Sequence, residues 1–216
     1  DNGLVSEVVT QDTINSLQGP MGIGHVRYPT AGSSSCQEAQ PFYTNTPTGI
    51  CLAHNGNLNN SSELKKQLKM RHSNTNSDSE LLMNTLADEI LKNLNTDQKG
   101  TIGTDMIFKA VTGLQKRVRG SYAAVVLIHG VGILAFRDPY GIRPLVFGSK
   151  KVSEGTNYVV ASESVAIDVL GYELCRDVSP GEAILFRSDG TMHSQICATT
   201  PTLSPCIFEY VYFARP

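Results

Sequence analysis

The order of the secondary-structure patterns limits the possible folds more than any other feature of this sequence. Patterns typical of amphipathic helices are grouped between residues 60 and 118, and short β-rich segments precede and follow them. A doubly wound parallel sheet would instead require helices that alternate with single strands. The grouping therefore predicts an α+β fold with layers of helices and strands, not repeated βαβ units.

The helix patterns have recognisable first turns and apolar faces. The earliest opens with Asn60 and Ser61, whose side-chain oxygens commonly accept the free N–H groups of a first turn. The next matches a capping box, in which Ser77 and Glu80 satisfy each other's backbone donors. Apolar residues then recur three or four positions apart, as on one buried helix face. We expect helices over residues 60–72, 77–94 and 104–118.

Most of the remaining sequence is β-rich, with turn signals between the segments. Gly130 and residues 188–190 have the composition of hairpin turns. The polar stretches 93–103 and 149–157 are expected to be surface loops, and the aromatic stretch 207–216 a strand that meets a partner surface. We expect strands over residues 22–28, 49–56, 121–130, 131–137 and 157–163, and a hairpin over residues 182–196.

Charge, hydropathy and cysteine content exclude several classes of protein. The net charge is −2, from 18 Lys and Arg against 20 Asp and Glu, so the basic surplus of a nucleic-acid-binding protein is missing. There is no run of about 18 apolar residues, and we expect no membrane span. The 5 cysteines are not spaced as a zinc site or a disulfide framework, which favours reduced thiols in a cytoplasmic protein.

The chain starts at Asp1 without a methionine, and we expect it to be a fragment that is incomplete at the N-terminus.

Three motifs contain groups that could act together on one small molecule. Arg27, in GHVRYPTAG, can hold a carboxylate with two parallel hydrogen bonds. Asn55 and Gly56, in AHNGNL, can direct two N–H donors at one point, as an oxyanion hole does. Asp78, in SDSE, can bind an ammonium group. Taken alone, these motifs are more typical of a solvated arginine, a tight turn and a helix-stabilising acid. Together they describe a site for an α-amino acid whose side-chain carbonyl is attacked.

Two further groups of residues have structural interpretations. RDPYGIRPL is expected to be a tight turn that Arg137 and Asp138 tie down, and Arg143 could pair with a nearby carboxylate. The 5 histidines lack the spacing of metal ligands, and we expect them to be structural or surface residues. The residues therefore predict no metal site.

Seven motifs, in this order, resemble the glutamine phosphoribosylpyrophosphate amidotransferase family: GHVRYPTAG, AHNGNL, SDSE, RDPYGIRPL, ASES, SPGE and FEYVYFARP. The resemblance covers residues 20–216. Glucosamine-6-phosphate synthase and asparagine synthetase share its outline, but Tyr28 stands where the former has Trp, and FEYVYFARP has no counterpart in either. The resemblance implies an N-terminal-nucleophile (Ntn) hydrolase fold, an αββα four-layer sandwich, over residues 1–205. Residues 206–216 would be the passage into a missing phosphoribosyltransferase domain.

The resemblance also assigns roles to individual residues. Arg27 would hold the α-carboxylate of glutamine and Asp78 its α-ammonium group, while Asn55 and Gly56 would form the oxyanion hole. Thr30 would line the same pocket. These roles agree with the chemistry inferred from the residues themselves.

The family's nucleophile is a cysteine at the mature N-terminus, whose thiolate attacks the amide and whose α-amino group handles the proton. Residue 1 is Asp in this sequence, so we expect no glutaminase turnover from this chain by itself. Cys36 and Cys51 are not expected to replace the nucleophile, because an internal residue has no free α-amino group.

For the full-length protein, the resemblance implies an amidophosphoribosyltransferase of de novo purine biosynthesis. It would hydrolyse glutamine and use the ammonia to make phosphoribosylamine from phosphoribosyl pyrophosphate. The implied partners are glutamine, its own phosphoribosyltransferase domain and further copies of itself; Mg²⁺ would belong to the missing domain, with no cofactor in this chain. Two alternatives stay open: a catalytically inactive module that binds glutamine or a partner subunit, and the glutaminase domain of another class II amidotransferase such as glucosamine-6-phosphate synthase.

Overall fold

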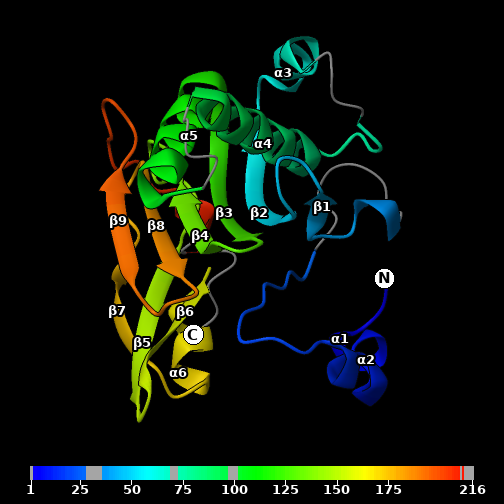
Figure 1. Ribbon diagram of the computed structural model, residues 1–216, viewed down its shortest axis with the longest axis vertical. Helices are drawn as coiled ribbons and strands as arrows, with labels where there is room; N and C mark the ends of the chain where they lie inside the picture. The colour runs from blue at the N-terminus through cyan, green and yellow to red at the C-terminus, as the bar shows by residue number, and fades with distance from the viewer. Residues whose placement is uncertain (1, 28–35, 69–72, 97–101, 210, 212–216) are drawn as a thin grey trace.

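The computed structural model describes residues 2–27, 36–68, 73–96, 102–209 and 211 (Figure 1). Its strands form two sheets in which the paired strands are antiparallel. The larger sheet has the order β1-β2-β3-β4-β8-β9, from β1 (Phe42–Thr44), β2 (Ile50–Leu58), β3 (Gly120–Ile128), β4 (Gly132–Arg137), β8 (Glu182–Arg187) and β9 (Met192–Ile196). The smaller sheet has the order β6-β5-β7, from β5 (Val146–Val152), β6 (Gly155–Ala161) and β7 (Glu173–Asp177).

Two long helices cover one face of the larger sheet (Figure 1). They are α4 (Asp78–Thr96) and α5 (Thr104–Arg117), close to the predicted bounds. Leu82, Leu86 and Ile90 recur every fourth residue along α4 and are fully buried, as are Ile107 and Leu114 of α5. This apolar stripe packs on the sheet and forms the main core. The other helical elements are α1 (Val5–Val8), α2 (Gln11–Ser16), a 3-10 turn (Cys36–Glu38), α3 (Ser61–Gln67) and α6 (Ser164–Val169).

A second core lies between the two sheets. Phe147 of β5 packs edge-on against Phe186 of β8, with ring centroids 6.0 Å apart. Because side chains alternate along a strand, Gly148 faces the opposite side, and a Cβ built there would lie 2.5 Å from Ile167 of α6. The layers are therefore helices, larger sheet, smaller sheet and α6, which confirms the predicted α+β fold and its αββα sandwich.

Two strand and loop predictions are wrong, each for a physical reason. Residues 22–27 are extended, but within the described ranges they pair with no strand; their side chains His25 and Arg27 instead reach the pocket described below. The polar stretch 149–157 is a hairpin, because β5 continues to Val152 and β6 starts at Gly155. Its polar side chains reflect the exposure of this end of the hairpin, not a loop.

The chain ends and turns agree with prediction only in part. The expected turns hold: Gly130 and Gly190 have φ values of +73° and +82°, which favour glycine. Residues 207–209 are helical, so the strand expected over 207–216 is wrong at these positions. Of the remainder, only residue 211 lies inside the described ranges. The helix expected over residues 60–72 is shorter, because α3 ends at Gln67. Residues 69–72 lie outside the described ranges.

The predicted cap at Asn60 and the capping box are wrong, because Asn60 and Glu80 tie neighbouring segments together, although the Ser77 hydroxyl does accept the N–H of Ser79 at 3.3 Å. The Asn60 side-chain oxygen accepts the N–H of Arg119 at 3.0 Å and caps no turn of α3. The Glu80 carboxylate accepts the N–H groups of Asn74 and Thr75, each at 2.8 Å, so it is not bonded back to Ser77 as a capping box requires. Both side chains thereby fix the ends of the helical layer. In the described part of the chain, no helix is long and apolar enough to cross a membrane.

Candidate functional site

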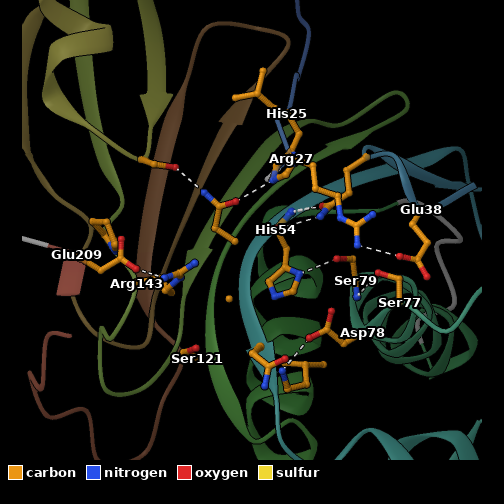
Figure 2. Close-up of a pocket in the computed structure, with 18 of the residues that line it drawn as sticks. His25, Arg27, Glu38, His54, Ser77, Asp78, Ser79, Ser121, Arg143 and Glu209 are labelled. Carbon is orange, nitrogen blue, oxygen red and sulfur yellow. Dashed lines mark hydrogen bonds and ion pairs between the residues drawn. The ribbon is translucent and has the colours of Figure 1, made fainter. Parts of the chain in front are cut away.

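A pocket of about 720 Å³ lies where β2, the start of α4 and the extended residues 22–27 come together (Figure 2). Four of the residues predicted to form a site line it: Arg27, Asn55, Gly56 and Asp78. The fifth, Thr30, lies outside the described residues. Three motifs spread over some fifty positions therefore meet around one cavity.

The outer edge of β2 supplies backbone groups to this pocket. The β1 ladder covers only the first part of β2, because Phe42 pairs with Leu52 and β1 begins there. Beyond it, the side chain of Gln40 takes over: it accepts the N–H of His54 at 2.7 Å and donates to the carbonyl of His54 at 3.2 Å. Further along, the N–H of Leu58 donates to Asp78 at 2.9 Å.

Gly56 lies between these two positions on the same edge. The register of β2 with β3 runs without a shift from Ile50 to Leu58, so N–H groups alternate in direction along this stretch. The N–H groups of His54 and Leu58 point away from β3, and that of Gly56 therefore does too, towards the pocket that it lines. Its φ is +144°, and a Cβ there would lie 2.0 Å from the carbonyl oxygen of Ser121. Only glycine fits at this position.

The Asn55 amide is hydrogen-bonded at both of its ends. Its oxygen lies 2.8 Å from Nε2 of His25, and its nitrogen donates to the hydroxyl of Ser162 at 3.0 Å. His25 belongs to the extended residues 22–27, and Ser162 directly follows β6 of the smaller sheet. The amide therefore has a defined orientation at the pocket wall.

His54 links the two sides of the pocket without carrying charge. It is 4% exposed, and its Nδ1 lies 2.8 Å from the hydroxyl of Ser79 in the first turn of α4. Burial lowers the pKa of His54 to about 4, although the nearby Asp78 carboxylate opposes this shift. Figure 2 shows His54 between Arg27 and Asp78. The imidazole is neutral at pH 7 and so leaves the negative charge of Asp78 uncompensated by this neighbour.

Arg27 contributes the positive charge on this side of the pocket. One of its terminal nitrogens lies 2.8 Å from a carboxylate oxygen of Glu38, which is 8% exposed. A guanidinium has five N–H donors in a fixed plane, a geometry that matches a carboxylate. The ion pair with Glu38 holds the guanidinium in place at the pocket wall.

The opposite wall is formed by the loop after β4 and by the last described residues. Arg143 pairs with Glu209, which confirms that this arginine binds a nearby carboxylate, and both line the pocket (Figure 2). The expected tight turn is confirmed as well. The Arg137 guanidinium donates to three backbone carbonyls, and the Asp138 carboxylate accepts the backbone N–H groups of Tyr122 and Tyr140. Burial raises the pKa of Asp138, while these N–H groups oppose that shift.

No cysteine is among the described residues that line this pocket. Cys51, four residues before Asn55, lines a different cavity of about 550 Å³, and burial raises the pKa of its thiol. Cys36 is exposed. Within the ranges that the structure describes, no group of three or more His, Cys, Asp or Glu side chains is arranged to hold a metal ion.

Sequence reasoning missed several residues of the pocket wall. His25 and His54 were expected to be structural or surface residues, and both lie against the predicted site. Their positions carried a usable signal, because His54 directly precedes Asn55 and His25 lies two residues before Arg27 in an extended segment. Ser162 had no such local signal, because it is 107 positions from Asn55, its partner.

Comparison with known protein families identifies the class of protein to which this chain belongs. Residues 25–169 match the family described as the glutamine amidotransferase domain, and the chain belongs to this family. The resemblance seen in the motifs is thereby confirmed, and its more specific part is supported by individual relatives.

Those relatives are amidophosphoribosyltransferases. The chain is 56% identical over 218 residues to the amidophosphoribosyltransferase of Pasteurella multocida (strain Pm70), and 55% identical over 219 residues to that of Escherichia coli (strain K12). Both alignments cover 100% of this chain but only 42% and 43% of the relatives. The chain thus spans less than half the length of the curated relatives it matches.

Solved structures agree with the sequence comparison. The glutamine phosphoribosylpyrophosphate (PRPP) amidotransferase from B. subtilis, complexed with ADP and GMP, superposes with a TM-score of 0.68 at 31% identity. A structure described as the allosteric regulatory enzyme of purine biosynthesis gives a TM-score of 0.70 at 34% identity. Each match covers 89% of this chain and 38% of the other. The likeness therefore supports the same fold and the same family as the sequence relatives.

Proposed function

We propose that the pocket binds glutamine and that the chain is the glutaminase part of an amidophosphoribosyltransferase. The observation that carries this proposal is the meeting of Arg27, Asn55, Gly56 and Asp78 around one cavity. These groups offer a cation, an anion and two N–H donors, which is the complement of an amino acid with a side-chain carbonyl. The relatives named above support the same assignment.

The two charged residues bind the amino-acid end of the substrate. Arg27, whose guanidinium is positioned by its ion pair with Glu38, holds the α-carboxylate, and Asp78 accepts the α-ammonium group. Asp78 is already fixed by the N–H of Leu58, so it needs little reordering when the ligand binds. Neutral His54 does not compete with the ammonium for this carboxylate.

Asn55 and Gly56 act on the other end of the substrate. The N–H of Gly56 and the amide of Asn55 donate to the carbonyl oxygen of the glutamine side chain as it gains negative charge. Each such donor typically contributes about 2.7–4 kcal/mol to the stability of the transition state. By resemblance to the family, the attacking group is the thiolate of an N-terminal cysteine; ammonia leaves, and water hydrolyses the thioester.

The activity of the whole protein is part of the proposal. The ammonia would pass to a phosphoribosyltransferase domain that follows residues 206–216, where it displaces pyrophosphate from phosphoribosyl pyrophosphate. Mg²⁺ would belong to that domain, and the full-length enzyme would be a cytoplasmic homo-oligomer of de novo purine biosynthesis. The high identity to amidophosphoribosyltransferases along the complete chain supports this assignment.

The test compares two nitrogen sources in the full-length protein. Arg27→Ala should raise the KM for glutamine roughly a hundredfold, because it removes a charge-assisted pair, and it should leave ammonia-dependent phosphoribosylamine synthesis unchanged. Arg119→Ala is a matched control, because its partner Glu63 and Arg119 itself are exposed. If Arg27→Ala impairs the glutamine and ammonia reactions equally, or neither, then the pocket is not the glutamine site.

A further inference from the structure

His25 and Ser162 are two residues of the pocket wall to which the proposed function gives no role. Both are hydrogen-bonded to the side chain of Asn55. One reaches it from the extended segment before residue 28, the other from the end of β6 in the smaller sheet. The Asn55 amide is thus held from two independent parts of the fold.

The hydrogen bonds of the amide determine which of its protons stays available. Asn55 has two N–H donors and one carbonyl oxygen. One N–H goes to the Ser162 hydroxyl, and the oxygen accepts from His25, which therefore carries its proton on Nε2. Nδ1 of His25 is then the unprotonated nitrogen; it is buried and has no partner among the described residues. Among the described residues, the second amide N–H of Asn55 has no partner, and Asn55 lines the pocket.

We infer that His25 and Ser162 are positioning residues, which hold the Asn55 amide so that its remaining N–H points at the carbonyl oxygen of bound glutamine. This inference rests on the proposed function and adds to it the residues that orient the oxyanion hole. His25 and Ser162 act through Asn55 and do not touch the substrate.

The physical reason is that an oxyanion hole works through donors that are oriented before the reaction starts. An unrestrained asparagine side chain would rotate about two bonds and would have to be ordered as charge develops on the substrate. The partners of Asn55 remove this freedom in the resting enzyme. Burial, together with the positive charge of Arg27, lowers the pKa of His25, so that the ring stays neutral with one N–H near pH 7.

The experiment measures kcat and KM for glutamine hydrolysis in the full-length protein, together with ammonia-dependent synthesis. Asn55→Ala is the reference and should reduce kcat roughly 10²–10³-fold. His25→Leu and Ser162→Ala should each reduce kcat at least tenfold, approximately, with KM and ammonia-dependent synthesis nearly unchanged. Matched controls are His193→Leu and Ser194→Ala on the exposed strand β9, which should behave as the wild type.

Two further sets of variants separate positioning from general structural damage. His25→Gln and Ser162→Thr keep a donor and a hydroxyl in place, and they should recover most of the lost kcat. In the double variant His25→Leu/Asn55→Ala, kcat should lie within about twofold of that of Asn55→Ala, because the histidine acts only through the asparagine.

Each result decides between the two proposals. If Asn55→Ala lowers kcat while His25→Leu and Ser162→Ala do not, the positioning role is wrong and the glutamine site stands. A multiplicative loss in the double variant, or failure of His25→Gln to recover activity, also overturns the positioning role. If Asn55→Ala itself keeps full kcat, the proposed oxyanion hole is wrong, and this inference falls with it.

Discussion

Replacing His54 with glutamine should remove much of the sensitivity of this fold to acid. The imidazole is buried and neutral, and its pKa is lowered from 6.5 to about 4. The unfolded chain therefore takes up a proton below its ordinary pKa of 6.5, whereas the folded chain does not until about pH 4. Between these values, each step down in pH favours the unfolded state.

The size of the effect follows from the two pKa values. At about pH 4.5 the difference corresponds to roughly 2–3 kcal/mol of lost stability, and at about pH 7.5 to almost none. The charged and titratable groups that act on the His54 ring are Asp78, His25 and Arg143. They remain in the variant, so the change in pH dependence reports on His54 and on its coupling to them. Glutamine can retain the contact with Ser79, since its amide also bonds a hydroxyl.

The assay is urea unfolding followed by far-UV circular dichroism at the two pH values. We expect the wild type to lose roughly 2–3 kcal/mol more stability than His54→Gln between about pH 7.5 and pH 4.5. His193→Gln, on an exposed strand, should behave as the wild type. An equal loss in the wild type and in His54→Gln would refute the argument, because it would mean that the ring is protonated in the folded state.

Two other predictions concern the backbone around the pocket. Gly56→Ala should lower the free energy of unfolding by roughly 3 kcal/mol or more, because φ is positive and the added Cβ clashes with backbone. It should therefore lower the thermal midpoint far more than Gly190→Ala, whose added Cβ meets nothing within 4 Å. Glu209→Gln should weaken the contact with Arg143 and loosen the chain from residue 201 onward. Hydrogen exchange of the amides at positions 202, 204 and 206, which donate to carbonyls at 139, 140 and 142, should then accelerate; unchanged exchange would mean that these backbone bonds alone hold the segment.

The helices could be predicted because their periodicity reports directly on burial. Leu82, Leu86 and Ile90 repeat at the spacing of one helix face, and the core is built on that face. The residues before Tyr28 show the limit of this reasoning. Their β-rich composition is compatible with a strand, but the side chains of His25 and Arg27 bind partners in the pocket wall. Composition does not distinguish a segment that pairs in a sheet from an extended segment that is held by its side chains.

The residues of the site likewise fall into those that local sequence predicts and those that it does not. Residue chemistry was enough to propose Arg27, Asn55, Gly56 and Asp78, because each type of group suits one part of the ligand. One of the groups that hold them, Ser162, was not predictable, because it is 107 positions from its partner Asn55. Local patterns describe what a residue can do, whereas tertiary structure decides which neighbour restrains it.

The short length of β1 has a consequence for the origin of the binding site. β1 contains three residues, and beyond them the outer edge of β2 is completed piece by piece, by the side chains of Gln40 and Asp78. The side chains that the structure describes leave the N–H of Gly56, between these two positions, without a partner. A longer β1 would pair with it through a peptide carbonyl and so occupy this position permanently. Under the proposed function, the side-chain carbonyl of glutamine accepts this N–H instead, and only while the ligand is bound.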